Sequence, residues 1–182
     1  MRALIVIDFT NDFVNGNLPV GEPAIEIEPA ICRLTETYAA QGDFVVMAVD
    51  LHEREDRWHP ETKLFPPHNL RGTSGRALYG RLAEVYERNK ERIYWMDKTR
   101  YSAFCGTDLE LKLRERGVTE VHLIGVCTDI CVLHTAVDAY NKGFVITVYE
   151  DAVASFNPEG HAWALEHFRG SMGANVTNSQ RG

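Results

Sequence analysis

The residue with the clearest potential for covalent chemistry is Cys131. It follows the apolar run 121–126, which is typical of a buried strand, and it precedes an apolar stripe at helical spacing that ends at Gly143. We therefore expect Cys131 in the first turn of a helix, just beyond a strand end. Free N–H groups at a helix start favour negative charge, so the pKa of this thiol should fall. The alternative is a small buried thiol without a chemical role.

Two charged residues follow other apolar runs. Asp8 comes directly after the run 3–7, and Lys98 follows the run 92–96. If these strand ends meet near Cys131, the three side chains supply a base, a cation and a nucleophile. The cation would stabilise the thiolate and the negative charge that develops when it attacks. Taken singly, Asp8 is equally typical of a turn, and Lys98 of a solvated charged turn.

A second cluster lies in the long irregular stretch 50–75. Asp50 and His52 are two residues apart just after an apolar run, so both side chains can point the same way. Glu61 and His68 follow in the same stretch. Carboxylate oxygens and imidazole nitrogens are suitable ligands for zinc, iron or manganese. The alternative is a set of surface histidines in a polar loop, although a loop this long is usually functional.

The segments that must position these residues alternate between strand and helix. The predicted strands are 3–7, 43–49, 92–96, 120–126 and 144–149. The predicted helices are 24–40, 76–88, 107–116, 129–142 and 158–169. This alternation indicates an α/β fold with a parallel sheet covered on both faces, in which ligands bind beyond the carboxyl ends of the strands. We expect one domain over residues 1–182.

Composition narrows the classes of partner. The chain has 182 residues, 45% of them hydrophobic and 25% charged, with a net charge of −7. An acidic chain of this kind argues against a nucleic-acid or anionic-membrane partner. No apolar run reaches membrane-spanning length, and the run 3–7 is too short for a signal peptide. The four cysteines form no dense disulfide framework, so we expect reduced thiols and a cytoplasmic protein.

The motifs around the three reactive residues carry a family resemblance. Asp8, Lys98 and Cys131 lie in the segments DFTNDF, DKTRYSAF and GVCTDICV. In these segments the chain resembles the nicotinamidase/isochorismatase-like cysteine hydrolases, and the resemblance runs from about Ala3 to Gly173. It implies a Rossmann-like, mostly parallel six-stranded sheet with helices on both faces. It also implies that the three residues form a catalytic triad.

The long loop narrows the resemblance to one branch. Asp50, His52 and His68 match the nicotinamidase (pyrazinamidase) branch, and so does the segment FPPH (65–68), which contains His68. Glu61 falls where some bacterial nicotinamidases place a fourth protein ligand. The resemblance therefore implies one divalent metal ion as cofactor, with zinc as the first expectation and iron or manganese as alternatives. For His59 there are two alternatives, an outer neighbour of the metal site and a surface residue, and we expect the surface position.

The resemblance also assigns a pocket. It implies a cis peptide bond between Val126 and Cys127, and an oxyanion hole formed by the backbone N–H groups of Cys127 and Cys131. Phe13, Phe65 and Tyr101 match positions where the family packs aromatic rings around a pyridine ring, and Cys127 would line the same pocket. Ordinary core or loop packing is the alternative for each aromatic residue.

By this resemblance the function is hydrolysis of nicotinamide to nicotinate and ammonia through a thioester on Cys131, with the metal ion orienting the pyridine ring. We expect this small molecule as the partner, and a homo-oligomer. Other readings remain. A related amidase with a ureido or carbamoyl substrate would keep the triad, and an isochorismatase typically lacks the metal ligands. A non-enzymatic metal or redox-sensing module could use Cys127 and Cys131.

Overall fold

The structure is a computed structural model that describes residues 1–180. Six strands form one sheet in the order β3-β2-β1-β4-β5-β6. Their bounds are β1 Arg2–Ile7, β2 Phe44–Asp50, β3 Ile93–Lys98, β4 Glu120–Val126, β5 Val145–Ala154 and β6 Asn175–Thr177. All five pairings are parallel, so the sheet of the described residues is parallel throughout rather than mostly parallel.

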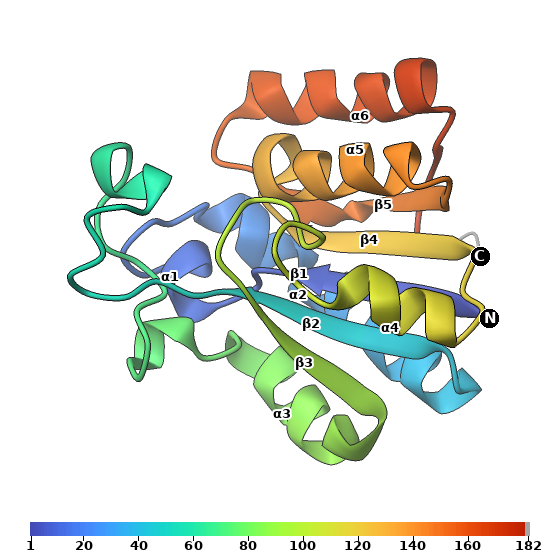
Figure 1. Ribbon diagram of the computed structural model, residues 1–182, viewed down its shortest axis with the longest axis horizontal. Helices are drawn as coiled ribbons and strands as arrows, with labels where there is room; N and C mark the ends of the chain where they lie inside the picture. The colour runs from blue at the N-terminus through green and yellow to red at the C-terminus, as the bar shows by residue number, and fades with distance from the viewer. Residues whose placement is uncertain (181–182) are drawn as a thin grey trace.

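Helices cover both faces of the sheet, as predicted (Figure 1). On one face lie α2 (Glu22–Gln41) and α3 (Gly80–Asn89), which pack on each other and on one apolar core. On the other face lie α4 (Leu109–Glu115), α5 (Leu133–Asn141) and α6 (Pro158–Met172) over a second core. A short helix, α1 (Asn11–Val14), follows β1. Strands that are covered on both faces carry apolar residues along most of their length, which explains the continuous hydrophobic runs in the sequence.

The parallel arrangement brings the strand ends together. β1, β2, β3 and β4 end at Ile7, Asp50, Lys98 and Val126, on the side where the long connection after β2 also lies. In Figure 1 this connection is the teal and green segment at the left, and the N-terminus is at the opposite end of the sheet. The predicted reactive residues therefore belong to one edge of the sheet, as expected for a parallel fold.

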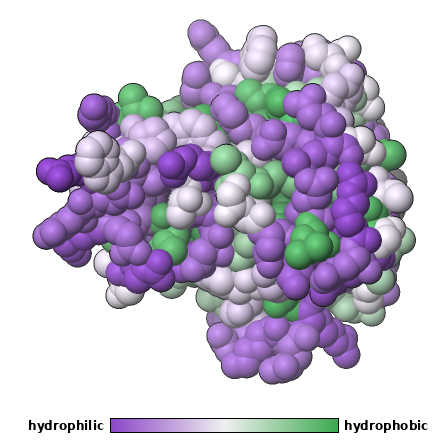
Figure 2. All heavy atoms as spheres, viewed as in Figure 1, coloured by the Kyte–Doolittle hydropathy of each residue, from purple (hydrophilic) through white to green (hydrophobic). Residues whose placement is uncertain are grey.

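The outer surface is mostly polar. Figure 2 shows hydrophilic residues over most of the visible face, with separate small hydrophobic patches. Among residues 1–180, no helix combines the length and apolar character that a membrane crossing requires.

Candidate active site and metal-binding group

Asp8 stands directly after β1 with φ of 55°, in the left-handed region of backbone conformation. Such a conformation costs a non-glycine residue about 1–3 kcal/mol and persists where the surroundings hold it. Here the N–H of Asp8 donates to the carbonyl oxygen of Ala48 over 3.0 Å. Its Oδ1 accepts from the N–H of Asp50 over 2.8 Å. The end of β2 therefore fixes the position of the Asp8 carboxylate.

Lys98, the last residue of β3, connects the other reactive groups from a fully buried position. Its Nζ lies 2.7 Å from Oδ2 of Asp8 and 3.8 Å from Sγ of Cys131. The same Nζ lies 3.6 Å from Oδ1 of Asp50. The structure thus brings the predicted Asp8, Lys98 and Cys131 together, and it adds Asp50 to the same cluster of charges.

Burial sets the protonation states of this cluster. It raises the pKa of Asp8 to about 6, although the Lys98 ammonium opposes the rise. It also raises the pKa of the Cys131 thiol well above its usual value, helped by the carboxylates of Asp8 and Asp50 and opposed by Lys98. Burial lowers the pKa of Lys98, but Asp8 and Cys131 outweigh it and the pKa is raised. At neutral pH the site therefore contains a carboxylate, an ammonium and a protonated thiol.

The predicted fall in the thiol pKa is wrong. Cys131 does lie at a helix start, in a π-helical turn (Thr128–Val132) that leads into α5. However, the side chain is only 5% exposed, and neighbouring carboxylates oppose the thiolate. The cost of burying a negative charge exceeds the favourable effect of the helix start. As a result, the thiol needs a base before it can attack, and Asp8 is the adjacent group that can accept its proton.

The turn that carries Cys131 is built on a close approach of two strands. Gly125 near the end of β4 has no side chain, and a Cβ there would lie 2.0 Å from the carbonyl oxygen of Ile7 on β1. Just after Gly125, the peptide bond between Val126 and Cys127 is cis, as the resemblance implies. The carbonyl oxygen of Cys127 then accepts from the N–H of Val132 over 3.1 Å and closes the turn.

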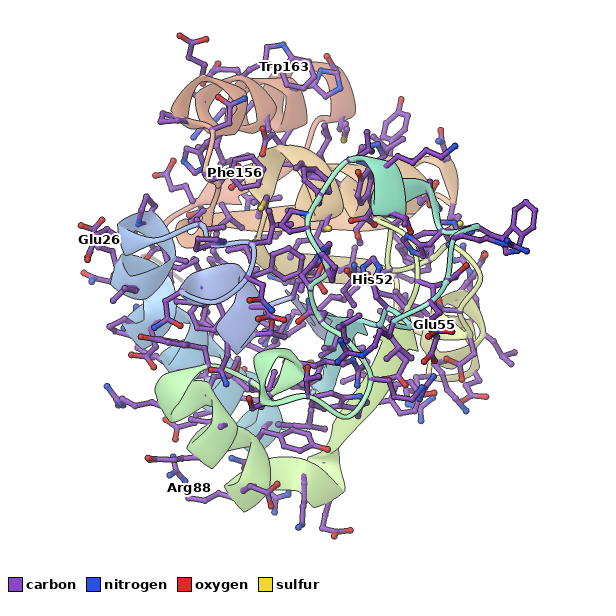
Figure 3. All side chains as sticks on the ribbon, turned by 90° about the vertical axis from the view of Figure 1, so that its left-hand side faces the viewer. Glu26, His52, Glu55, Arg88, Phe156 and Trp163 are labelled. Atoms are coloured by element: carbon purple, nitrogen blue, oxygen red, sulfur yellow. The ribbon has the colours of Figure 1, made fainter. Side chains whose placement is uncertain are left out.

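Four buried side chains form a second group beside the triad. Asp50, His52, Glu61 and His68 each offer one ligand atom, and these atoms all lie within 4.8 Å of one another. Nε2 of His52 lies 2.6 Å from Oδ2 of Asp50, and Nε2 of His68 lies 3.5 Å from a carboxylate oxygen of both Asp50 and Glu61. Figure 3 looks onto this edge of the molecule, with His52 near the middle of the view.

This group fits a divalent cation. Oδ1 of Asp50 and Nε2 of His68 are buried without a hydrogen-bond partner among the described residues. Nδ1 of His68 bonds to the carbonyl oxygen of Pro66 over 2.8 Å, so Nε2 is the nitrogen that faces the carboxylates. Burial lowers the pKa of His68, but contacts with Asp50 and Glu61 raise it to about 10. The group therefore favours positive charge, and its oxygen and nitrogen donors suit zinc, iron or manganese.

His59 is buried, and its predicted surface position is wrong. Its Nδ1 accepts from the N–H of Glu61 over 3.2 Å, and its Nε2 donates to the carbonyl oxygen of Thr99 over 2.7 Å. Its ring centroid lies 4.3 Å from that of His52. The long loop folds back on the end of β3, where the hydrogen bond between His59 and Thr99 holds it. Sequence reasoning could not find this role, because it depends on where the loop folds.

A small pocket adjoins both the triad and the metal-binding group. Four of its lining residues are those that the resemblance assigns to the substrate pocket: Phe13, Phe65, Tyr101 and Cys127. Cys131 and Glu61 also line it, so the thiol and the metal-binding group face one space. Three further apolar residues line it that the sequence did not single out: Leu18, Ile130 and Phe156. Isolated apolar residues carry no signal that separates a pocket wall from ordinary core.

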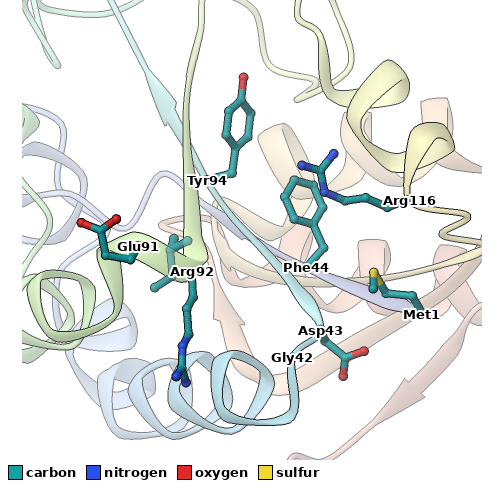
Figure 4. Close-up of a pocket in the computed structure, with 9 residues that line it drawn as sticks. Met1, Gly42, Asp43, Phe44, Glu91, Arg92, Tyr94 and Arg116 are labelled. Atoms are coloured by element: carbon teal, nitrogen blue, oxygen red, sulfur yellow. The ribbon is translucent and has the colours of Figure 1, made fainter.

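A larger depression lies at the amino ends of β2 and β3 (Figure 4). Its charged side chains are Asp43, Glu91, Arg92 and Arg116, and the Arg116 guanidinium lies 4.3 Å from the Phe44 ring centroid. Within the described part of the chain, no cysteine or histidine lines this depression. The chemically competent pocket is therefore the smaller one.

Comparisons with known proteins identify a family and a fold. The family model for the isochorismatase domain matches residues 2–181. The isochorismatase family protein PncA of Bacillus subtilis (strain 168) is 63% identical over 179 residues, which cover 96% of this chain and 98% of that protein. The crystal structure of nicotinamidase/pyrazinamidase PncA from Bacillus subtilis has a TM-score of 0.95 at 62% identity, covering 97% of this chain and 99% of that one.

A more distant relative was solved with a metal ion. The crystal structure of the pyrazinamidase of Pyrococcus horikoshii in complex with zinc has a TM-score of 0.86 at 31% identity. It is matched over 97% of this chain and 98% of its own. The match of the family model over nearly the whole chain, the full-length similarity and the common fold lead to one assignment: the chain is a member of the isochorismatase-domain family.

Proposed function

We propose that this protein is a nicotinamidase, which hydrolyses nicotinamide to nicotinate and ammonia through a thioester on Cys131. The observation that carries the proposal is one mostly apolar pocket that is lined both by Cys131 and by the metal-binding residue Glu61. An apolar pocket with a few polar anchors is the usual form of a small-molecule site. High identity to the Bacillus subtilis nicotinamidase/pyrazinamidase over nearly the whole chain supports the same substrate class.

The first step is proton transfer from Cys131 to Asp8. The pKa of Asp8 is about 6, so at neutral pH its carboxylate is ionised and can accept the proton of the buried thiol. Sulfur then attacks the amide carbon. Lys98, 3.8 Å from Sγ, stabilises the negative charge on sulfur. The backbone N–H groups of Cys127 and Cys131 hold the amide oxygen as it becomes negative.

The second step is loss of ammonia. Asp8, now protonated, returns its proton to the amide nitrogen, and the carbon–nitrogen bond breaks to leave a nicotinoyl thioester on Cys131. Asp8 is a carboxylate again and can take a proton from a water molecule that attacks the thioester. The thiol regains its proton from Asp8, and nicotinic acid leaves and ionises to nicotinate as its carboxyl proton passes to ammonia. The same carboxylate therefore acts as base and acid in both halves of the reaction.

The pocket walls hold the pyridine ring for this chemistry. Phe13 and Phe65 contribute apolar surface, and their ring centroids lie 5.2 Å and 6.3 Å from that of His68. Asp50, His52, Glu61 and His68 would hold one divalent ion, for which we propose zinc, and this ion would bind the ring nitrogen directly or through water. Orienting the ring in this way would place the amide carbon beside Sγ.

Two features favour this function over the other readings. The buried metal-binding group distinguishes the site from an isochorismatase, which typically lacks these ligands. Burial raises the pKa of Cys127 to about 12, which makes it a poor thiolate and argues against a redox pair with Cys131. A homo-oligomeric state and a cytoplasmic location stay predictions.

The proposal is tested by ammonia release from the metal-loaded protein. With nicotinamide we expect equal amounts of ammonia and nicotinate, and with a ureido or carbamoyl amide we expect little ammonia. A higher kcat/KM for the ureido or carbamoyl amide than for nicotinamide would contradict the proposal and favour the related amidase. Loss of ammonia release in Asp8→Asn would tie the activity to this site rather than to a contaminant.

A further inference from the structure

Asn69, which immediately follows the metal-binding residue His68, joins three segments of the chain. Its side chain and backbone are fully buried, and its φ of 43° lies in the left-handed region. Its N–H donates to Oδ2 of Asp12 over 2.8 Å, and its Oδ1 accepts from the hydroxyl of Thr10 over 2.8 Å. Its carbonyl oxygen accepts from the N–H of His52 over 3.1 Å. Asn69 therefore links the segment after β1, the end of β2 and the long loop.

The Asp12 carboxylate lies against two glycines. Asp12 is 3% exposed, and its Oδ1 accepts from the N–H of Asn17 over 3.1 Å. A Cβ on Gly75 would lie 2.2 Å from Oδ2 of Asp12, and a Cβ on Gly16 would lie 2.7 Å from Oδ1. Both glycines thus leave room for this carboxylate. The buried Asp12 carboxylate therefore holds the backbone of Asn69 and of Asn17, and it does not line the pocket that contains Cys131.

The consequence of these contacts is the spacing of two metal-binding histidines. The carbonyl oxygen of Asn69 accepts a hydrogen bond from the backbone N–H of His52. Because His68 directly precedes Asn69, this bond holds His68 beside His52, and the ring centroids of the two histidines lie 4.4 Å apart. On its other side His68 is fixed by the bond from Nδ1 to Pro66. His68 is thus held by contacts on both sides of it along the chain, through Pro66 and through Asn69.

We infer that Asp12 and Asn69, with Thr10, are positioning residues that set His52 and His68 at ligand spacing for the metal ion. The inference rests on the metal-binding part of the proposed function. Residues behind a metal ligand fix its orientation, and their loss typically weakens metal binding by about 10- to 100-fold. A purely structural role of Asp12 would instead lower the stability of the protein and leave the metal affinity of the folded molecules unchanged.

The test measures the dissociation constant of Zn²⁺ by competition with a chelator, on full-length protein stripped of metal. For Asp12→Asn, which keeps the shape of the side chain but removes one acceptor and the charge, we expect binding about 10- to 100-fold weaker. Asp43→Asn is the control, because Asp43 also accepts a backbone N–H, from Arg2 over 3.2 Å, at the opposite edge of the sheet. Its zinc affinity should equal that of the parent.

A second pair keeps the test decisive if Asp12→Asn does not fold. Thr10→Val removes only the hydroxyl that holds Asn69 and should weaken zinc binding, whereas Thr10→Ser keeps the hydroxyl and should restore it. In both Thr10 variants the rate at which a thiol reagent alkylates Cys131 should stay close to that of the parent. Zinc affinity equal to the parent in the folded Asp12 and Thr10→Val variants would overturn the inference. A parent that binds none of zinc, iron and manganese would instead overturn the metal site itself, and the inference with it.

Discussion

The carboxyl and amino edges of the sheet both carry charged side chains and a depression, but they differ in how deeply the charges are buried. At the carboxyl edge Asp8 and Lys98 are 0% and 1% exposed, beside the smaller pocket. At the amino edge the side chain of Arg2 is 41% exposed and pairs with Asp43 over 2.6 Å, near the larger depression. The size of a cavity therefore does not locate the chemistry. Interactions between charges are strong where water is excluded and weak where it is not.

The difference follows from topology. At the carboxyl edge four parallel strand ends and one long loop converge, so carboxylates, an ammonium, a thiol and two imidazoles meet in a small volume. The amino edge receives the ends of helices and short turns, and its charges remain in contact with water. We expect substitutions at the two edges to differ accordingly, by orders of magnitude in activity.

The largest effect is expected from Cys131→Ala. Removing the nucleophile should lower kcat by at least about 10³-fold, since the thioester cannot form. Cys32→Ala is the matched control: Cys32 is also buried, at 2% exposure, but lies in α2 away from the pocket. Steady-state ammonia release measures both. Turnover of Cys131→Ala within about tenfold of the parent would show that another group attacks the amide.

A large effect on metal binding is expected from His68→Ala. Loss of a direct ligand should weaken Zn²⁺ binding by more than the roughly 100-fold upper value for an outer residue, and nicotinamide binding should weaken with it. The buried His122 of β4, bonded to Tyr38 over 2.7 Å, provides the contrast. His122→Ala should lower stability by about 1–3 kcal/mol and leave zinc affinity unchanged. Elemental analysis and thermal unfolding of both variants test this, and equal metal content in the two would contradict it.

An intermediate effect is expected from pH. The base form of Asp8 is required, and its pKa is about 6, so the fraction of ionised Asp8 is nearly complete above pH 7 and falls as the pH drops through 6. We therefore expect kcat/KM to decrease about tenfold per unit below pH 6. Asp8→Asn should lower kcat by at least about 10²-fold and abolish this limb. A parent profile that stays flat down to pH 5 would exclude Asp8 as the base.

The smallest effect is expected at the amino edge. Arg116→Ala removes a guanidinium that lies over the Phe44 ring and lines the larger depression. Because nothing there contacts the reacting groups, kcat/KM for nicotinamide should stay within about twofold of the parent. A greater loss, in protein that unfolds at the same temperature as the parent, would mean that the two edges are coupled.

Much of the fold could be predicted from the sequence. The apolar runs that predicted β1 to β4 lie within a residue or two of the observed strands, because strands buried on both faces are recognisable as continuous hydrophobic segments. β6 (Asn175–Thr177) was missed because it is short and partly exposed. β5 continues to Ala154 through Glu150 and Asp151, and these charged residues concealed its length.

The candidate site was predictable in its residues but not in its electrostatics. Asp8, Lys98 and Asp50 each stand at a strand end, and the parallel sheet brings such residues together. The direction of the Cys131 pKa was predicted wrongly, because it depends on burial depth and on carboxylates from other strands. The position of His59 depends on how a long loop folds, and hydrophobic periodicity contains no information about that.

The role of Cys131 as nucleophile is tested most directly by stopping the reaction of the parent enzyme with nicotinamide by rapid acid quench and mapping the protein by mass spectrometry. We expect one nicotinoyl group per modified chain, bound as a thioester to Cys131 and absent from Cys32, Cys105 and Cys127. The same experiment with Cys131→Ala should yield unmodified protein. A nicotinoyl group on another residue, or turnover by the parent with no modification at any quench time, would contradict the assignment of Cys131 as the nucleophile.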